Sequence, residues 1–480
     1  MFLALFAAWA SPAELYGFGA RAMGRAQGGV SLPGDAGSAL LNPAALAGSP
    51  RSQMLLGYSL VRFDFDPLPP VYWDTNRDGL LDDRDAPLEI GGIDPGDGTM
   101  LGIRRAVGPR LGVGLSLFVP TGRLIRYQTI EPRLPTYFMY QNRTQRYAMA
   151  VGFGAKPLTS LYIGAGVRLL SRSYLNATFT VDAVVDGDAD GDGVEDVVSG
   201  TADVHELTFE LKPAAVPVAG LQWKPGELFP RFEGFALGLT WRGEGGLPVE
   251  VGLDAQINTQ ATNVGDLEPL VIAAVAQAQV SVFDHYVPQQ FQFGASYSRE
   301  AVFSAYIDVH HTRWAAMQLN YSKLMSASIQ TSLADTSGVD ISAGLTPVIE
   351  WRNTWSLRAG TEWYLPTRDL PGGAGWLRPA VRGGFGYEPS PLVGQRAETA
   401  LLDSDRLIFA LGLGVEHGAV WGVLDGPVSW DAFLQIHSLA KGTLERPQTA
   451  GLRAGYPVDD APVQIGGRFY ATGLQWSIEY

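Results

Sequence analysis

From Gln53 to the end of the chain, apolar and polar residues alternate with a period of two. In one clear example, within 110–119, five apolar residues share one parity, and Gly112, Gly114 and Ser116 take the other. The apolar set is Leu111, Val113, Leu115, Leu117 and Val119. Successive side chains of a strand point to opposite faces, so this period predicts strands with one apolar face.

The same alternation recurs along most of the chain and predicts about fourteen strands. We expect them at 53–62, 99–106, 110–119, 144–155, 159–180, 204–224, 234–251, 289–299, 301–313, 353–365, 375–388, 405–416, 427–438 and 463–480. Pro213 and Pro217 interrupt the sixth of these segments. Proline has no N–H to donate to a ladder, so the sequence predicts a bulge or a local edge there.

The connections between these segments alternate in length. Residues 63–98 and 120–143 are long, whereas 107–109 and 156–158 are short. This rhythm is typical of outer-membrane β-barrels, whose outer loops are long and whose periplasmic turns are tight. A soluble antiparallel sandwich also alternates, but it does not ordinarily need so many long strands in one domain.

Composition supports a barrel that crosses a membrane. The 480 residues include 58 Gly, 18 Tyr and 12 Trp, no Cys, and a net charge of −14. Beyond residues 2–10, no apolar run approaches the roughly 18 residues that a membrane helix needs, so strands must cross any membrane, and only as a closed barrel. The absence of cysteine excludes disulfides, and the acidic balance argues against nucleic acid as a partner.

The start of the chain reads as the remnant of an export signal. Phe2–Ala10 is apolar, and Ala8-Trp9-Ala10 has the small-x-small form of a cleavage site; a disordered apolar tail is the alternative. We therefore expect an export signal at 1–13, a plug at 14–50 and the barrel at 51–480. The last strand ends on Tyr480, and a terminal aromatic is the usual signal read by the outer-membrane assembly machinery.

The stretch 17–50 (GFGARAMGRAQGGVSLPGDAGSALLNPAALAGSP) reads neither as a strand nor as a long helix. Its glycines loosen the backbone, Asp35 can cap a short turn, and Pro43 stops that turn. A flexible linker is the alternative, and a nucleotide loop is disfavoured because the glycine spacing is wrong and no strand precedes it. Such a segment is expected to pack inside another structure.

Four motifs in order resemble the FadL-type outer-membrane transporters. They are the G-x-G-x-R-A-M-G-R-A of 17–26 with Asn42-Pro43, the hairpin at 288–314, the pair 353–365 and 378–391, and Ser404-Asp405-Arg406. The resemblance covers nearly the whole chain.

This resemblance implies a monomeric outer-membrane barrel of a Gram-negative-type envelope, plugged by a hatch. The hatch residues would be Gly24, Asp35, Asn42 and Pro43. Long-chain fatty acids or similar hydrophobic molecules would enter by diffusion down their gradient and leave sideways near the third strand, where Gly112, Gly114 and Pro120 would form a lateral gate. A non-transporting surface or secretion scaffold with the same hatch is the competing hypothesis.

Two long connections carry acidic loops with calcium-ligand spacing. In the first, the ligands would be Asp74, Asn76, Asp78, Leu80 (carbonyl), Asp82 and Asp85; in the second, Asp188, Asp190, Asp192, Val194 (carbonyl) and Asp196. Oxygen ligands at positions one, three, five, seven and nine around a sharp glycine turn suit a hard cation. The sequence predicts two structural calcium ions outside the membrane, although Asp-Gly loops are often only solvated turns.

Residues 266–283 are apolar almost all round, and Asp266 and Pro269 suit the start of a helix. A helix here would either cover the barrel mouth as a lid or form one wall of a capture groove. The groove residues would be Leu270, Val271, Val275 and Phe283, facing Leu324 and Met325 of the next long connection.

Enzyme motifs are weak. His310 and His311 are neighbours on a strand and must face opposite sides, and neither H-E-x-x-H nor G-x-S-x-G occurs. Ser429, Asp431 and His437 share one parity, which raises the possibility of a phospholipase, but pore lining is the simpler interpretation. We predict that the protein is not an enzyme.

Overall fold

The computed structural model describes residues 17–72, 87–88, 93–121, 135–141, 147–176, 181–187, 196–202, 208–245, 248–260, 271–283, 287–317, 323–331, 350–373, 375–393, 401–418, 426–445 and 462–480. The expected export signal at 1–13 lies outside these residues. No helix among them is long and apolar enough to cross a membrane.

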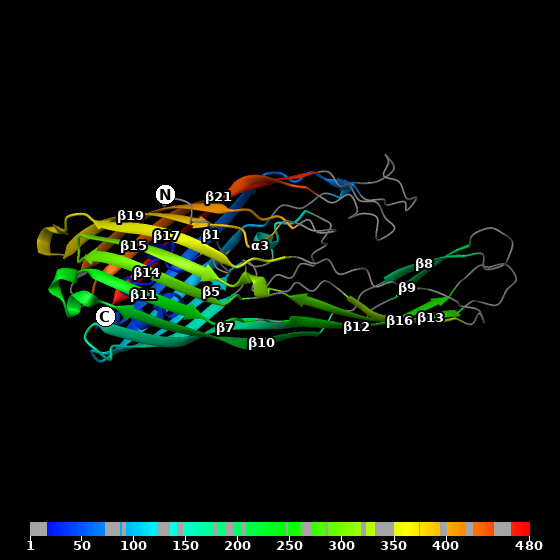
Figure 1. The fold of residues 1–480 in the computed structure, drawn as a ribbon, viewed down its shortest axis with the longest axis horizontal. Coiled ribbons are helices and arrows are strands. Elements are labelled where there is room, and N and C mark those ends of the chain that lie inside the picture. Colours follow the sequence, from blue (N-terminus) through cyan, green and yellow to red (C-terminus); the bar gives the residue numbers. More distant parts are fainter. Residues whose placement is uncertain are drawn as a thin grey trace, which may run out of the picture.

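Fourteen antiparallel strands form a closed barrel, as the sequence predicted (Figure 1). In chain order they are β1 (Gln53–Phe65), β4 (Gly96–Val107), β5 (Leu111–Pro120), β6 (Ala148–Ala155), β7 (Leu161–Asn176), β10 (Thr208–Trp223), β11 (Phe235–Arg242), β14 (Gln290–Arg299), β15 (Phe303–Thr312), β17 (Thr354–Tyr364), β19 (Trp376–Glu388), β20 (Arg406–Gly418), β21 (Val428–Leu444) and β22 (Val463–Glu479). Each strand pairs with its neighbours in sequence, and the last closes on the first, from Gln53↔Glu479 to Phe65↔Gly467. Closure leaves no open edge for lipid to face.

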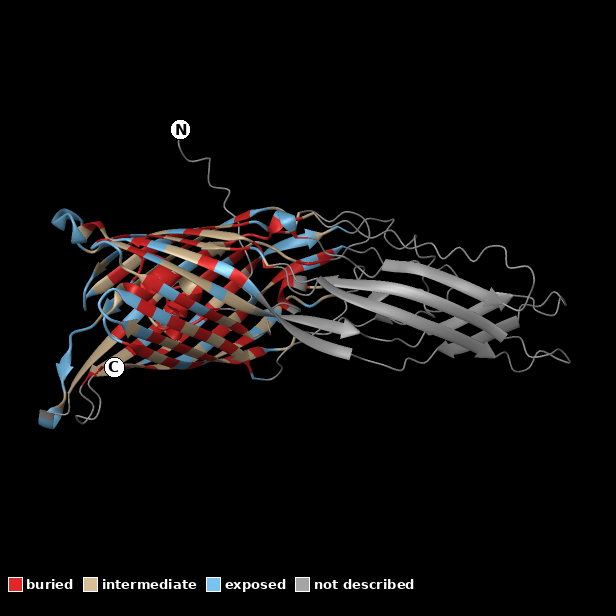
Figure 2. Ribbon diagram, turned by 90° about the horizontal axis from the view of Figure 1, so that it is seen from below, coloured by how far each residue is buried: buried red, intermediate tan, exposed pale blue. Residues whose placement is uncertain are grey.

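Buried and exposed residues alternate along the strands of the wall, as the colours of the ribbon in Figure 2 show. On β20, Leu411 and Leu413 are each 65% exposed on the outer face, whereas Ile408 and Ala410 are buried inside. Leu474 on β22 is 68% exposed. An apolar outer band of this kind is what a lipid-facing barrel requires.

The two prolines of β10 cause an edge and no bulge. Pro213 and Pro217 sit in an unbroken ladder with β7, whereas β11 pairs with β10 only from Val218 to Trp223. The Pro217 carbonyl accepts a hydrogen bond from Gly243 on the β11 side, so its missing N–H also faces that side. Of the two predicted alternatives, a bulge or a local edge, the structure has the local edge, because the ladder with β7 loses no donor.

The long connections carry further strands, and one of these corrects the sequence analysis. The expected strand 234–251 ends at Arg242, and a separate sheet contains β12 (Pro248–Gln260), β13 (Val271–Phe283) and β16 (Lys323–Thr331), beyond the end of the barrel in Figure 1. The helix expected at 266–283 is wrong, because 271–283 form β13. Alanine favours a helix, but valine at 275, 280 and 282, alternating in part with polar residues, favours a paired strand.

Short pieces complete the described structure. They are β2 (Val71–Tyr72) with β3 (Pro87–Leu88), β8 (Val181–Gly187) with β9 (Asp196–Ala202), β18 (Arg368–Asp369), α3 (Phe138–Gln141), η2 (Pro225–Glu227), η3 (Pro230–Phe232), η4 (Trp314–Ala316) and η5 (Pro371–Gly373). Inside the barrel, the segment from Gly17 contains α1 (Ala20–Met23), α2 (Ser38–Leu41) and η1 (Pro43–Gly48).

Candidate functional site in the barrel lumen

The segment 17–50, called the hatch from here on, fills the lower lumen and touches the wall on many sides. Here the lower end of the barrel is the one with the short connections, such as 108–110, and the upper end is the one with the long connections. A Cβ on Gly112 would lie 2.2 Å from the Leu46 carbonyl oxygen, and one on Gly164 would lie 2.2 Å from the Ala44 nitrogen. Similar close approaches to hatch atoms occur at Gly102, Gly154, Gly238, Gly360, Gly384 and Gly412. Glycine at these positions lets two backbones come closer than any side chain would allow.

The predicted hatch residues lie at the turns of this segment. Asn42 caps η1 by accepting from Ala44 N–H at 3.1 Å, and its amide donates to the Val30 carbonyl at 2.7 Å. Pro43 begins η1, immediately after α2 ends at Leu41. The Asp35 carboxylate accepts from Gly37 N–H at 2.8 Å, so it closes the turn before α2, and Gly37 itself is the N-cap.

Gly24 meets the wall at a second glycine. A Cβ on Gly24 would lie 2.8 Å from the Gly412 Cα on β20. The two backbones are therefore in contact without any intervening side chain.

A group of buried charges, called the charged belt, joins the hatch to one side of the wall. Glu362 on β17 accepts from Arg21 at 2.9 Å and from Arg382 at 2.6 Å, and Arg25 lies 3.4 Å away. Arg382 also pairs with Asp431 at 2.7 Å. Glu362 is 1% exposed, so its charge depends on these partners.

The belt continues on β17, β19 and β20. Glu388 accepts from both Arg358 and Arg406. Arg358 also donates to the hatch carbonyls of Ala26 and Gln27, each at 3.2 Å. The belt thus satisfies charges on the wall and backbone groups of the hatch at once.

Further wall side chains donate hydrogen bonds to the hatch backbone. Gln222 donates to the Val30 and Leu32 carbonyls at 2.9 and 2.8 Å, and Arg242 donates to those of Leu40 and Leu41 at 2.8 and 3.0 Å. The donors come from opposite parts of the wall, because Gln435 on β21 donates to the Met23 carbonyl at 2.7 Å. Buried carbonyls need such partners, so the contacts fix one position of the hatch.

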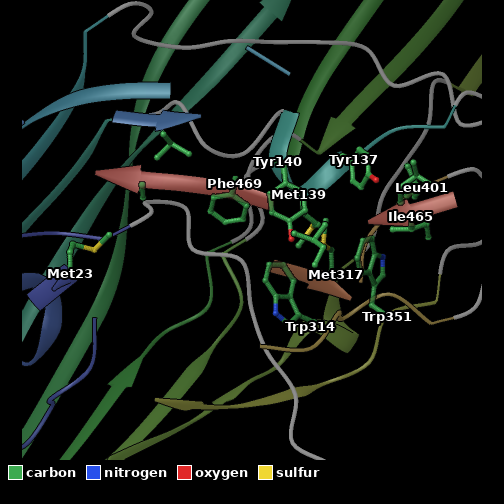
Figure 3. Packing of buried hydrophobic residues seen from close by; sticks show 14 of the residues in the cluster. Met23, Tyr137, Met139, Tyr140, Trp314, Met317, Trp351, Leu401, Ile465 and Phe469 are labelled. Atoms are coloured by element: carbon green, nitrogen blue, oxygen red, sulfur yellow. The ribbon is translucent and has the colours of Figure 1, made fainter. Parts of the chain in front are cut away.

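Above the hatch lies a cluster of large apolar side chains, called the aromatic cluster. Figure 3 shows Met139, Met317 and Trp314 side by side, with Tyr140 and Phe469 next to them. Its buried members are Ala20, Met23, Val61, Tyr137, Met139, Tyr140, Trp314, Met317, Trp351, Leu401, Leu402, Phe433, Leu439, Val463, Ile465, Phe469 and Ala471. They come from the hatch, the upper ends of the strands and three long connections, so the connections fold inward over the lumen.

The rings of this cluster pack at tilted or edge-on angles. Phe65 lies 4.5 Å from Tyr137 and 5.1 Å from Tyr140, measured between ring centroids, and Tyr140 lies 5.6 Å from Phe469. These are the geometries that aromatic pairs prefer. At the border with the charged belt, His437 stacks on Phe469 at 4.1 Å.

Two hydroxyls tie α3 and its flank to neighbouring connections. Tyr137 donates to the Gly466 carbonyl at 3.2 Å, and Tyr140 donates to Asp403 at 3.3 Å. Ser390 donates to Asp403 at 2.7 Å. Burial raises the pKa of Asp403 to about 7, despite these hydrogen bonds, which favour the charged form.

A cavity of about 120 Å³ lies between the hatch and one side of the wall. Trp314 lines it and also belongs to the aromatic cluster, so the two regions meet there. Other lining residues include Phe18, Val216, Val218, Arg242, Val287 and Gln292. Charged side chains, among them Arg358 and Glu388 of the charged belt, also line the cavity, so its walls are apolar in part and polar in part.

The predicted lateral-gate residues lie in regular structure. Gly112 and Gly114 pair with β4 and with β6 in continuous register, and both press against Leu46 of the hatch. Their glycine identity is thus explained by close approach to the hatch. Pro120 ends β5, opposite Gly98, two residues beyond Phe118, the last residue of β5 that pairs with β6.

The structure describes only some residues of the remaining predicted sites. Val271, Val275 and Phe283 lie on β13, and Leu324 and Met325 lie on β16, its neighbour in the sheet; Leu270 lies outside the described residues. The first calcium loop, 74–85, also lies outside them. Of the second loop only Asp196 is described; it begins β9 and pairs with Gly187.

The three residues considered for a phospholipase, Ser429, Asp431 and His437, are not arranged as a catalytic triad. His437 Nε2 lies 2.9 Å from Gln435 Oε1, and Asp431 pairs with Arg382. Ser429 lies 2.6 Å from Ser477. These side chains line the wall, as the simpler interpretation held.

Comparisons with known proteins agree with this architecture. The profile of a family described as "Outer membrane protein transport protein (OMPP1/FadL/TodX)" matches residues 2–418. A solved structure of a Pseudomonas aeruginosa FadL homologue has a TM-score of 0.55 at 17% identity, covering 98% of this chain and 99% of its own.

Two further solved structures were compared. The P. putida toluene transporter TodX has a TM-score of 0.46 at 13% identity, covering 97% of this chain and 99% of its own. The Ralstonia pickettii toluene transporter TbuX gives 0.46 at 13%, covering 96% and 98%. A search of curated proteins finds no match.

Proposed function

Because the chain belongs to the OMPP1/FadL/TodX family of outer-membrane transport proteins, we propose that it takes up hydrophobic molecules passively, down their concentration gradient. The cargo is a long-chain fatty acid, a monoaromatic hydrocarbon or a molecule of similar apolarity. Capture takes place outside, the aromatic cluster binds the cargo, and release is lateral, into the membrane.

The observation that carries this proposal is the meeting of the aromatic cluster and the cavity at Trp314. Apolar side chains there face inward, where a barrel that only filled its lumen with water would place polar ones. Met139 and Met317 add adaptable surface, since methionine repacks easily around ligands of different shape.

The proposal predicts that replacing Trp314 weakens ligand binding. In Trp314→Ala, titration calorimetry with laurate should show affinity lowered about tenfold, because a lost aromatic contact is worth about 1.5 kcal/mol. The matched control is Trp430→Ala on the lipid-facing side of β21, where the side chain is 57% exposed. Equal effects of both variants would remove the aromatic cluster from the binding site.

The competing scaffold hypothesis draws on the polar lower lumen, which the charged belt and the hatch fill. It is tested by mass spectrometry of molecules that co-purify with the protein in detergent. A co-purified fatty acid or hydrocarbon supports transport. No co-purified molecule, together with no heat on addition of laurate or toluene, favours the scaffold.

We also propose two structural calcium ions, in the loops 74–85 and 188–196. The support is the ligand spacing in the sequence, and the pairing of Gly187 with Asp196 frames the second loop with a hairpin. Calorimetry with millimolar calcium should give heat that Asp78→Ala and Asp192→Ala each reduce by about half, if each loop binds one ion. No heat from the unmodified protein would leave both loops as solvated turns.

A further inference from the structure

The described hatch leaves little room for a molecule to pass straight down the barrel. Glycines on eight wall strands, from β4 to β20, meet hatch backbone atoms at distances where no Cβ fits. The charged belt and the hydrogen bonds from Gln222 and Gln435 hold the same segment in place. A molecule in the cavity therefore needs either a displaced hatch or an opening in the wall.

Among the residues that the structure describes, the ladder between β10 and β11 is the shortest of the barrel. It has six residue pairs, from Val218↔Arg242 to Trp223↔Leu237, against seven between β6 and β7 and eight between β5 and β6. Among the described residues beyond this ladder, one further backbone hydrogen bond joins the strands, from Gly243 N–H to the Pro217 carbonyl at 2.8 Å.

Beyond Gly243 the chain turns to its other neighbour. Gly245 exchanges two backbone hydrogen bonds with Val287, at 2.9 and 2.6 Å. On the β10 side, Pro213 and Pro217 offer no N–H to replace these contacts. Within the part of the chain that the structure describes, the backbone hydrogen bonds of Gly245 are thus with Val287 and not with β10.

The cavity lies directly behind this seam. Val216 and Val218 from β10 and Arg242 from β11 line it, together with Val287 and Pro288. On the outer face, Pro217 is exposed. No residue of β5 lines the cavity.

We infer that the hydrophobic cargo leaves the lumen between β10 and β11, at Pro217 and Gly243. This inference rests on the proposed function and moves the exit away from β5, where the sequence had suggested it. Opening the seam breaks the Gly243–Pro217 hydrogen bond first, and it leaves the hatch contacts of Gly112 and Gly114 intact. The valines on the inner side and the proline on the outer side give the cargo apolar contacts on both faces of β10.

The chain has no cysteine, so disulfides can be introduced one seam at a time. Pro217 and Gly243 are opposite each other, and Cα atoms of such a hydrogen-bonded pair lie about 5.5 Å apart, within disulfide range. The exit variant is Pro217→Cys/Gly243→Cys. Leu117→Cys/Met149→Cys locks β5 to β6, and Phe291→Cys/His311→Cys locks β14 to β15 as the control.

Uptake of radiolabelled laurate by cells that express each variant is measured before and after dithiothreitol, with cross-linking verified by mass. We expect the oxidised Pro217–Gly243 variant to lose uptake, to regain it on reduction, and to bind laurate normally in calorimetry. The other two cross-links should leave uptake unchanged. Unchanged uptake with the seam locked, or loss only with β5 locked, overturns the inference while the proposed function stands.

A single substitution tests the same seam without a cross-link. Val216→Trp fills the end of the cavity behind Pro217 and should also abolish uptake. Normal uptake in this variant overturns the inference. If the unmodified protein neither binds nor takes up laurate or toluene, the proposed function fails and the exit fails with it.

Discussion

The lower and upper halves of the lumen are built by different forces. Below, the hatch is held by buried charges and by hydrogen bonds with fixed directions, such as Arg382 to Glu362 at 2.6 Å. Above, the aromatic cluster is held by apolar contacts, such as that between Tyr140 and Phe469, whose ring centroids lie 5.6 Å apart. Hydrophobic contacts do not depend on direction as hydrogen bonds do. The connections supply much of the upper half, whereas strands and hatch supply the lower.

This difference separates a fixed part from an adaptable part. A buried charge that loses its partner is costly, so the lower lumen has one favourable arrangement. An apolar side chain can give up contacts with its apolar neighbours and contact an apolar ligand instead at little cost in free energy. Its surface stays removed from water in either case. The comparison therefore assigns closure to the hatch and ligand binding to the aromatic cluster.

Removing the central charge of the belt should have the largest effect. Glu362→Gln leaves Arg21, Arg25 and Arg382 around a neutral group. Removing one partner of such a buried ion pair lowers the stability of the folded state by about 3 kcal/mol or more. We expect the hatch to detach while the barrel persists, because each strand keeps its ladder partners. Limited proteolysis should then cut within 17–50 and spare the strands.

The control is an ion pair that is partly exposed, which shows whether loss of a charge at any position is enough to release the hatch. Glu416→Gln breaks the pair with Arg378, whose N–O distance is 2.7 Å. Because this pair is partly exposed, we expect stability to fall by less than about 1 kcal/mol. Equal protection of the hatch in both variants would show that Glu362 does not hold it.

A smaller effect should follow from adding one methyl group where hatch and wall touch. Gly164→Ala places a Cβ 2.2 Å from the Ala44 nitrogen, so one backbone must move, at a cost of about 1–3 kcal/mol. Gly383→Ala is the control, since its nearest neighbour would be 4.0 Å away. Denaturant unfolding, followed by proteolysis within the hatch, measures the stability of the two variants. Equal stability of Gly164→Ala and Gly383→Ala would contradict the close contact between hatch and wall.

The sequence predicted the wall much better than the lumen. Period-two alternation is local, so all fourteen strands could be located from it, with the largest errors where β11 and β21 end. The partners of Glu362 could not be located, because Arg21 and Arg382 become its neighbours only through the closed register. One signal was available: charged residues at inward positions of strands, such as Arg358 and Glu362, need partners inside the barrel.

The aromatic cluster was harder to predict, and for a different reason. Tyr140, Trp314 and Leu401 come from three separate connections, and no short-range pattern brings them together. The helix expected at 266–283 failed because alanine-rich apolar segments of that length fit both structures, and pairing with β12 and β16 decided the outcome.

The smallest predicted effect concerns how α3 is held over the aromatic cluster, and it depends on pH. Burial raises the pKa of the Asp403 carboxyl to about 7, so the folded protein keeps a proton that the unfolded chain releases near its ordinary value. The stability contributed by the neutral carboxyl is therefore complete at low pH and is lost as the pH rises through about 7. Amide hydrogen exchange of 135–141, corrected for intrinsic rates, should be faster at about pH 8 than at about pH 5. Asp403→Asn should remove this difference, because its amide cannot ionise, whereas Asp369→Asn at the exposed β18 should leave it unchanged. A pH difference that persists in Asp403→Asn would place the titrating group elsewhere.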